Sequence, residues 1–199
     1  MRVTQDLRRY HRQMLLPDFG EAGQSKVGAS RVLLVGCGAL GCAIADMLAR
    51  AGVGRLTIVD RDVVELTNLQ RQVLFDEADA AEGLPKAEAA QRRLRAVNSQ
   101  VRVDAVVADL APANAEKLLQ ASGPPSVLLD GTDNFETRYL LNDLAVKHGI
   151  AYVYGGAVGT RGMAMNVLPG QGPCLRCLFD EPPAAGTMPT CDTAGVLGR

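Results

Sequence analysis

The feature that most constrains this chain is residues 31–41, RVLLVGCGALG, in which an apolar run leads into three glycines. Gly36, Gly38 and Gly41 form a G-x-G-x-x-G pattern, which is typical of a strand–turn–helix unit that binds a nucleotide. The first glycine permits a tight turn, the second lets a phosphate approach the backbone, and the third allows close helix–strand packing. Because a helix N-terminus has free N–H groups, the sequence predicts a phosphate-binding turn here.

The residues after this turn fit the same unit. Apolar side chains recur at helical spacing, and Gly52 and Gly54 end that pattern. The next apolar run, residues 55–60, closes on Asp60. It follows Gly38 at about the 20-residue spacing that places an acid on a ribose hydroxyl. Strand, turn, helix, second strand and acid together predict a nucleotide site.

Polar residues after the second strand separate two kinds of nucleotide enzyme. Residues 60–72, DRDVVELTNLQRQ, are polar where an NAD-dependent dehydrogenase would turn directly into its next helix. Pro85 is placed to begin a helix, and Lys86 follows it. Arg71 and Lys86 supply one planar and one point-like cation, as a triphosphate requires. An NAD-dependent oxidoreductase remains an alternative that depends on the glycine turn and Asp60 alone.

Further strands complete the predicted sheet. They are expected at residues 101–107, 127–130, 151–154 and within 162–168, with helices between them. Asp133 follows the strand at 127–130, at the end where open parallel sheets bind ligands, and could hold Mg²⁺ on phosphates. It could also begin the next helix, with Glu136 completing a capping box. The predicted fold is a Rossmann-like three-layer α/β sandwich with a mainly parallel sheet.

Composition limits the class of protein. A length of 199 residues suits one domain, since domains average about 100–200 residues. The net charge of −1 gives no overall field for nucleic acid or a membrane surface. No apolar run approaches the ~20 residues of a membrane span, and the charged N-terminus lacks the apolar core of a signal peptide. We therefore expect a cytoplasmic protein.

The five cysteines are an odd number, which argues against a disulfide framework. Cys174 and Cys177 form a C-x-x-C pair that indicates half of a zinc site or a redox pair, and zinc is preferred although this chain has no second pair. Cys37 and Cys42 are interpreted as small packing residues. Cys191 lies in a tail rich in Pro, Ala and Gly that is expected to be a mobile loop.

These motifs together resemble the ThiF/MoeB adenylyltransferases, relatives of the ubiquitin-activating enzymes. The matching segments, in family order, are RYHRQMLLP, VGCGALG, DRDVVELTNLQRQ, LPKAEAA, DGTDNFETR, CLRC and TCDTAGVLG. The resemblance implies a single domain over residues 1–199, with an N-terminal arm at 1–30 and a crossover loop at 178–199. Because no closing helix follows, we expect the sheet to be unfinished and the chain truncated.

The implied activity is adenylation of the C-terminal glycine of a ubiquitin-like sulfur-carrier protein that ends in Gly-Gly, similar to MoaD or ThiS. Mg-ATP would be consumed in molybdopterin or thiamine biosynthesis. Alternatives are a tRNA-modifying member of the family and an inactive scaffold. The resemblance also implies a homodimer. We expect no membrane partner, because no apolar run is long enough, and no nucleic-acid partner, because the chain lacks a strong basic balance.

The resemblance assigns roles to particular residues. The implied nucleotide-binding residues are Gly36, Gly38, Ala39, Gly41, Asp60, Asp62, Thr67, Asn68, Leu69, Gln70, Arg71, Lys86, Asp133 and Asn134. The implied catalytic residues are Arg12, Arg71, Lys86, Asp133 and Cys191. Arg12 would reach into the neighbouring protomer's site, and Cys191 could link covalently to the carrier. Asp133 would bind Mg²⁺, and Cys174 and Cys177 would bind Zn²⁺.

Overall fold

The computed structural model is built on one six-stranded sheet with the strand order β3-β2-β1-β4-β5-β6. It describes residues 7–179 together with Glu181 and Gly195. Neighbouring strands are parallel except β5 and β6, which form an antiparallel hairpin. The strands are β1 (Arg31–Val35), β2 (Arg55–Asp60), β3 (Arg102–Val107), β4 (Val127–Asp130), β5 (Ala151–Val158) and β6 (Arg161–Val167). The mainly parallel sheet that the sequence predicts is therefore confirmed.

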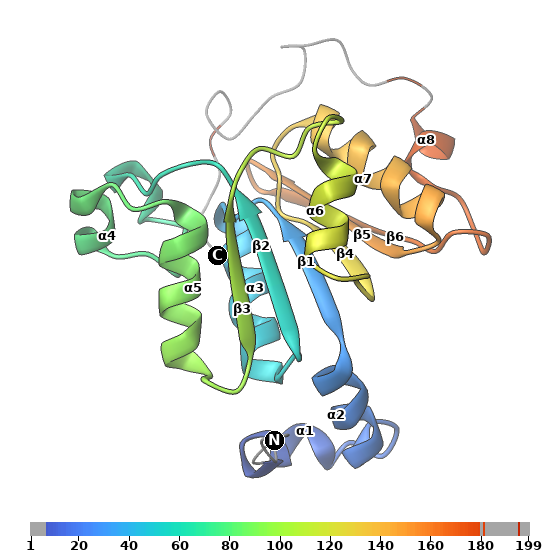
Figure 1. Cartoon of the computed structure of the whole chain (residues 1–199), viewed down its shortest axis with the longest axis horizontal. Helices are drawn as coiled ribbons and strands as arrows, with labels where there is room; N and C mark the ends of the chain where they lie inside the picture. Colours follow the sequence, from blue (N-terminus) through green and yellow to red (C-terminus); the bar gives the residue numbers. More distant parts are fainter. Residues whose placement is uncertain (1–6, 180, 182–194, 196–199) are drawn as a thin grey trace.

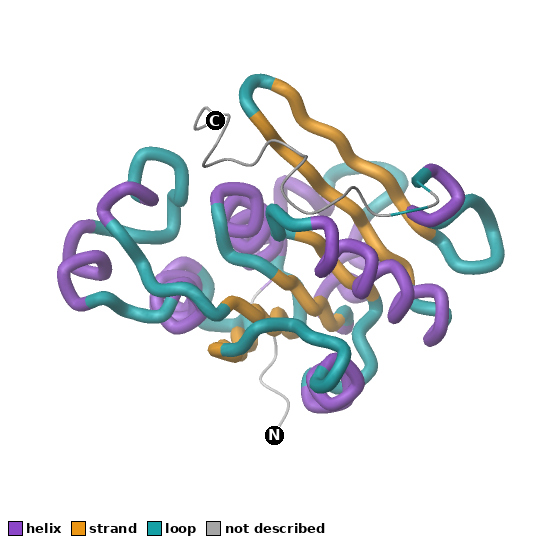
Figure 2. The backbone as a smooth tube through the Cα atoms, turned by 90° about the horizontal axis from the view of Figure 1, so that it is seen from above, coloured by secondary structure: helices purple, strands orange, loops and turns teal. Residues whose placement is uncertain are grey.

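Helices cover both faces of this sheet, which makes a three-layer α/β sandwich (Figures 1 and 2). The α-helices are α1 (His11–Met14), α2 (Gly20–Ala29), α3 (Ala39–Ala51), α4 (Glu77–Glu82), α5 (Lys86–Val97), α6 (Ala115–Ala121), α7 (Phe135–His148) and α8 (Leu175–Leu178). Two 3₁₀ helices are η1 (Leu7–Tyr10) and η2 (Leu66–Asn68). Among the described residues, no helix is long and apolar enough to cross a membrane.

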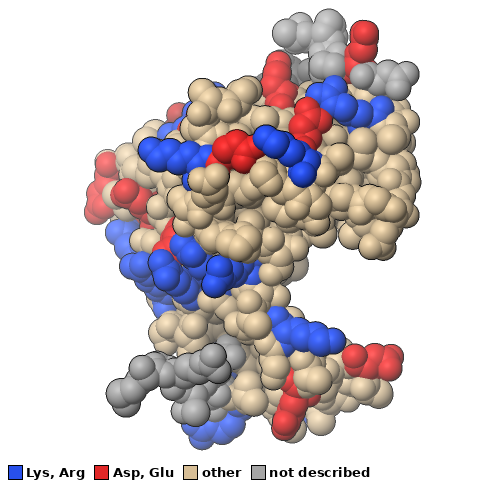
Figure 3. All heavy atoms as spheres, turned by 45° about the vertical axis from the view of Figure 1, so that its right-hand side comes forward, with Lys and Arg blue, Asp and Glu red and all other residues tan. Residues whose placement is uncertain are grey.

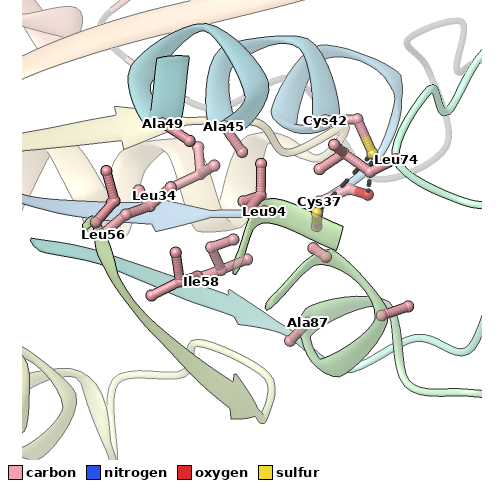
Figure 4. Close-up of a cluster of buried hydrophobic side chains, with 14 of the residues drawn as sticks. Leu34, Cys37, Cys42, Ala45, Ala49, Leu56, Ile58, Leu74, Ala87 and Leu94 are labelled. Carbon is pink, nitrogen blue, oxygen red and sulfur yellow. Dashed lines mark hydrogen bonds between the residues drawn. The ribbon is translucent and has the colours of Figure 1, made fainter. Parts of the chain in front are cut away.

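Two apolar clusters lie on opposite faces of the sheet. Leu34 and Ile58 pack beneath α3 and α5 (Figure 4). Leu33 and Leu128 pack beneath α6 and α7. Because consecutive residues of a strand point to opposite faces, β1 is buried on both sides, as its unbroken apolar run predicts. Cys37 and Cys42 are fully buried in the first cluster, which confirms them as packing residues.

Several element ends follow from local chemistry that the sequence shows. Gly52 ends α3 in the left-handed region, with φ +84°, and its N–H donates to the carbonyls of the last helical turn. β2 occupies the predicted residues 55–60. Pro85 directly precedes α5, where its missing N–H removes no helical hydrogen bond.

Other elements differ from the prediction. The predicted break after Tyr154 is wrong, because Gly155 and Gly156 continue β5 and pair with Ala164 and Met163 of β6. The hairpin ladder thus overrides the low strand propensity of glycine. The six-residue helix α4, which has a capping box at its start, was not predicted.

The N-terminal arm is fastened to the end of the sheet where the parallel strands begin (Figure 1). Tyr10 is buried against Gly52, and its hydroxyl accepts a 2.8 Å hydrogen bond from Asn98 Nδ2. The same Nδ2 donates to the Ala49 carbonyl at 2.8 Å. Gln24, also buried, donates to the Ala51 carbonyl at 3.0 Å. These bonds tie the arm to the last turn of α3 and to the end of α5.

Candidate functional site

A cleft of about 690 Å³ opens where β1, β2 and β4 end. The strand order reverses at β1, with β2 on one side and β4 on the other, and open parallel sheets bind ligands at such points. The charged residues that line the cleft are Asp60, Arg61, Asp62, Glu65, Arg71, Lys86, Asp109 and Asp133. Polar chemistry is therefore concentrated at one end of the sheet.

The glycine turn forms one wall of this cleft. Gly36 has a φ of +88°, and a Cβ there would lie 2.6 Å from the backbone carbonyl group of Gly131. Gly41 packs against the Gly36 carbonyl, so a side chain has no room there either. Apart from Gly38 itself and its two chain neighbours, no described atom lies within 4 Å of the position that a Cβ of Gly38 would take. The turn and packing roles predicted for these glycines are confirmed, and phosphate binding at the open position stays a prediction.

Asp60, at the end of β2, holds the glycine turn in place. Its Oδ2 accepts the Cys37 N–H at 2.6 Å, and its Oδ1 accepts the Asp62 N–H at 2.8 Å. Burial raises the pKa of Asp60, and the two N–H donors and the charge of Lys86 act against that shift. Each carboxylate oxygen keeps acceptor capacity for a ribose hydroxyl, since Asp60 is only half-buried and lines the cleft.

Two cationic side chains, Lys86 and Arg71, also line the cleft. The Lys86 side chain is only 9% exposed, and its Nζ lies 3.0 Å from Asp62 Oδ2. The Lys86 N–H also donates to the Asp62 carbonyl at 2.8 Å. Arg71 Nη1 donates to the Thr67 carbonyl at 3.0 Å, which leaves the other guanidinium N–H groups for a ligand. Asn68 accepts a backbone N–H at the start of η2 through Oδ1, so its NH₂ remains for the cleft.

Asp133 stands at the edge of the cleft. Asn134 caps α7, since its Oδ1 accepts the Thr137 N–H at 2.9 Å. The capping box predicted for Asp133 and Glu136 is therefore wrong, because the helix begins one residue later. Within the described part of the chain, the exposed Asp133 carboxylate makes no hydrogen bond or ion pair. It is free to bind a cation.

Not every predicted nucleotide-binding residue reaches this cleft. Gly36, Gly38 and Ala39 line it, but Gly41 does not. The other predicted residues outside the lining are Thr67, Leu69 and Gln70. Leu69 packs against the apolar cluster beneath α3 and α5, and Thr67 and Gln70 are exposed. Their proposed contacts with a nucleotide stay predictions.

Arg12 lies far from this chain's own cleft. It is exposed on α1, which lies at the end of the sheet where the strands begin (Figure 1), whereas the cleft lies where β1, β2 and β4 end. A role for Arg12 in the reaction therefore requires a second copy of the chain, as its predicted role states. Cys191 lies outside the described residues, and its covalent role remains a prediction.

Cys174 and Cys177 come together at the start of α8, with their Sγ atoms 3.7 Å apart. This separation suits two ligands of a tetrahedral zinc site, which needs four. Within residues 7–179, Glu181 and Gly195, no group of three or more His, Cys, Asp or Glu side chains could hold a metal ion. The described residues thus supply half of a zinc site, and the expectation of zinc finds no support.

A buried polar cluster behind the cleft was missed from the sequence. Asp130, the last residue of β4, is 1% exposed, and its carboxylate accepts hydrogen bonds from Thr132 and Tyr152. Arg138 of α7 lies beside it. An acidic residue at the end of a strand was the available signal for Asp130, because the same signal identified Asp60. No local pattern distinguishes Arg138 from a surface arginine.

Comparison with known proteins places this geometry in a family. The model of the ThiF family matches residues 10–199. The chain is 49% identical over 189 residues to the sulfur carrier protein ThiS adenylyltransferase of Bacillus subtilis, covering 95% of this chain and 55% of that protein. It is 45% identical over 204 residues to a sulfur carrier protein adenylyltransferase of Thermus thermophilus, covering 100% of this chain and 73% of that protein.

A solved structure agrees with these sequence matches. The Escherichia coli MccB structure with ATP superposes with a TM-score of 0.74 at 27% identity, over 86% of this chain and 51% of that chain. The chain spans about half the length of MccB and of the Bacillus protein. Since the family model extends over almost every described residue, including the glycine turn and the cleft, the chain belongs to the ThiF family.

Proposed function

We propose that this protein adenylates the C-terminal glycine of a ubiquitin-like sulfur-carrier protein, using Mg-ATP and releasing pyrophosphate. The observation that carries the proposal is the convergence of the glycine turn, Asp60, Arg71, Lys86 and Asp133 on one cleft. Two relatives named as sulfur carrier protein adenylyltransferases support this substrate class. The carrier would serve thiamine or molybdopterin biosynthesis.

The charge in the cleft supports ATP accompanied by Mg²⁺. Five carboxylates and three cationic side chains line it, so a bare triphosphate would meet an excess of negative charge. Mg²⁺ binds one or two carboxylates together with phosphate oxygens. In this proposal Asp60 would bind the ribose, the backbone at Gly38 would bind the phosphates, and Asp133 would bind the metal.

The chemistry requires positioning and charge neutralisation more than proton transfer. The terminal carboxylate of the carrier attacks the α-phosphorus, the bond from that phosphorus to the bridging oxygen breaks, and pyrophosphate leaves with the electron pair. No general base is needed, because the carboxylate is ionised near pH 7. Lys86 and Arg71 would stabilise the charge that develops on the phosphates.

A homodimer is part of the proposal. Arg12 lies on an arm that projects from the body of the molecule, which Figure 3 shows with a hollow between the two. Two copies that exchange these arms would place each Arg12 at the other's cleft. We also propose a cytoplasmic location, because Cys37, Cys42, Cys174 and Cys177 are all free thiols, as in a reducing compartment.

The test is exchange of labelled pyrophosphate into ATP in the presence of Mg²⁺ and a carrier that ends in Gly-Gly. We expect exchange with the complete carrier and none with the carrier lacking its last glycine. Lys86→Ala is the matched variant that should lose exchange while retaining the fold by circular dichroism. Absence of exchange with both thiamine-type and molybdopterin-type carriers would contradict the proposal, and tight binding of NAD would favour an oxidoreductase.

A further inference from the structure

We propose that Arg138 is a positioning residue that fixes the turn at residues 131–134 and thereby aims Asp133 at the metal. This inference rests on the proposed function, in which Asp133 binds Mg²⁺ beside the phosphates. Arg138 itself does not line the cleft. It lies on α7, one helical turn beyond the Asn134 cap, and points back toward the turn.

The guanidinium group of Arg138 is held from several sides. Its side chain is 8% exposed, and Nη2 donates a 2.8 Å hydrogen bond to the Thr132 carbonyl. Its Cζ lies over two aromatic rings, 5.1 Å from the centroid of Phe135 and 5.3 Å from that of Tyr154. Its Nε lies 3.6 Å from Asp130 Oδ2. A buried planar cation that contacts two aromatic rings has little freedom to move.

Asp130 holds the other polar groups of the same residue. Thr132 donates to Asp130 Oδ1 through its N–H at 2.8 Å and through its hydroxyl at 2.7 Å. Tyr152 donates its hydroxyl to Asp130 Oδ2 at 3.1 Å. The N–H, hydroxyl and carbonyl of Thr132 are thus all bound by two buried groups of opposite charge. Asp133 follows directly, so its backbone starts from a fixed point.

The turn at residues 131–134 also packs against the glycine turn. Gly131 packs so closely on Gly36 that neither position can accept a side chain. Gly131 is held by its contact with Gly36, and Thr132 is held by its hydrogen bonds to Asp130 and Arg138. The direction of the Asp133 side chain, which follows them in the chain, depends on both. Partners that orient a metal ligand from behind commonly change metal affinity roughly 10- to 100-fold when they are removed.

The first test is the Mg²⁺ dependence of pyrophosphate exchange at saturating ATP. For Arg138→Lys, which keeps the charge and loses the planar group, we expect the half-saturating Mg²⁺ concentration to rise roughly 10-fold. Tyr152→Phe is the matched control, because it removes one bond to Asp130 without touching Thr132. It should lower the unfolding midpoint and leave the Mg²⁺ dependence unchanged. Equal Mg²⁺ dependence in wild type and Arg138→Lys would overturn the inference.

A double variant distinguishes the positioning of Asp133 from a general loss of stability. In the Asp133→Asn background, Arg138→Lys should add no further shift in the Mg²⁺ dependence, because the ligand that it positions is already altered. A full additional shift would contradict positioning through Asp133. If Arg138→Lys folds poorly, Phe135→Leu removes one of the two aromatic contacts and should give a smaller shift in the same direction.

Hydrogen exchange gives a readout that does not depend on catalysis. Arg138→Lys should speed exchange in peptides that cover residues 131–134 and leave those covering α3 unchanged. A uniform increase over the whole chain would show a merely structural role and overturn the inference. If wild type shows no pyrophosphate exchange but the local effect is present, the proposed function fails while the positioning of the turn stands.

Discussion

Asp60 and Asp130 occupy equivalent positions in the sheet, but only Asp60 lines the cleft. Each is the last residue of a parallel strand that borders β1, and each accepts a backbone N–H from the turn that follows it. Asp60 is half-buried, lines the cleft, and has no arginine partner among the described residues. Asp130 is fully buried and lies beside Arg138. The groups packed behind a carboxylate at the end of a strand therefore decide whether it can bind a ligand.

The first prediction concerns removal of the buried carboxylate of Asp130. Asp130→Ala should lower the free energy of unfolding by about 3–5 kcal/mol, because it leaves the Arg138 charge buried without its counterion. Asp60→Ala should cost less, since Asp60 is only half-buried and its loss leaves no buried arginine without a counterion among the described residues. Urea unfolding of the two variants measures the contrast, and equal losses would contradict it.

The second prediction concerns ligand binding. Asp60→Asn should weaken ATP binding about 10- to 100-fold, since a hydrogen bond to a charged group contributes about 1.5–3 kcal/mol. Asp130→Asn keeps an acceptor for Thr132 and does not face the cleft, so it should change ATP affinity much less. Calorimetric titration with Mg-ATP distinguishes the two. A larger loss for Asp130→Asn would reverse the assignment.

The third prediction concerns the backbone contact between the two turns. Gly36→Ala forces an alanine into the left-handed region, which alone costs about 1–2 kcal/mol, and its Cβ would press on Gly131. Both turns should shift, so stability and ATP affinity should fall together. Gly38→Ala has room for its Cβ and serves as the control in thermal unfolding. Equal unfolding temperatures for the two variants would argue against this contact.

The fourth prediction follows from the pKa of Asp60, which burial raises in the folded state. Below the unfolded pKa of about 3.9 the carboxyl is protonated in both states, so its contribution to stability is fully present. That contribution is lost as the pH rises through the folded pKa. Wild type should therefore lose stability relative to Asp60→Asn as the pH rises above about 4. Urea unfolding across this range checks the sign, and a relative gain for wild type would contradict it.

The smallest expected effect is at Gln70, which the family resemblance places among the nucleotide-binding residues. It is exposed and does not line the cleft. Gln70→Ala should change stability by less than about 0.5 kcal/mol and leave ATP affinity unchanged. Arg71→Ala, one residue away, should weaken ATP binding clearly. A loss at Gln70 comparable to that at Arg71 would mean that the loop rearranges around the nucleotide.

Those residues of the cleft that follow a local spacing along the chain could be predicted from the sequence. The three glycines, Asp60 and the Pro85–Lys86 step are read along the chain, and the structure brings them together. The cap of α7 was misplaced by one residue because Asp and Asn cap helices equally well. The contact between Asp130 and Arg138 could not be predicted, since it forms only when α7 packs onto the sheet.

If the cleft transfers AMP to a carrier, mass spectrometry of the carrier will detect the product. Incubated with ATP, Mg²⁺ and this protein, a carrier that ends in Gly-Gly should gain the mass of one AMP group at its C-terminal glycine. The Lys86→Ala protein should leave the carrier unchanged. A carrier that is never modified, or one modified equally by wild type and Lys86→Ala, would contradict the account.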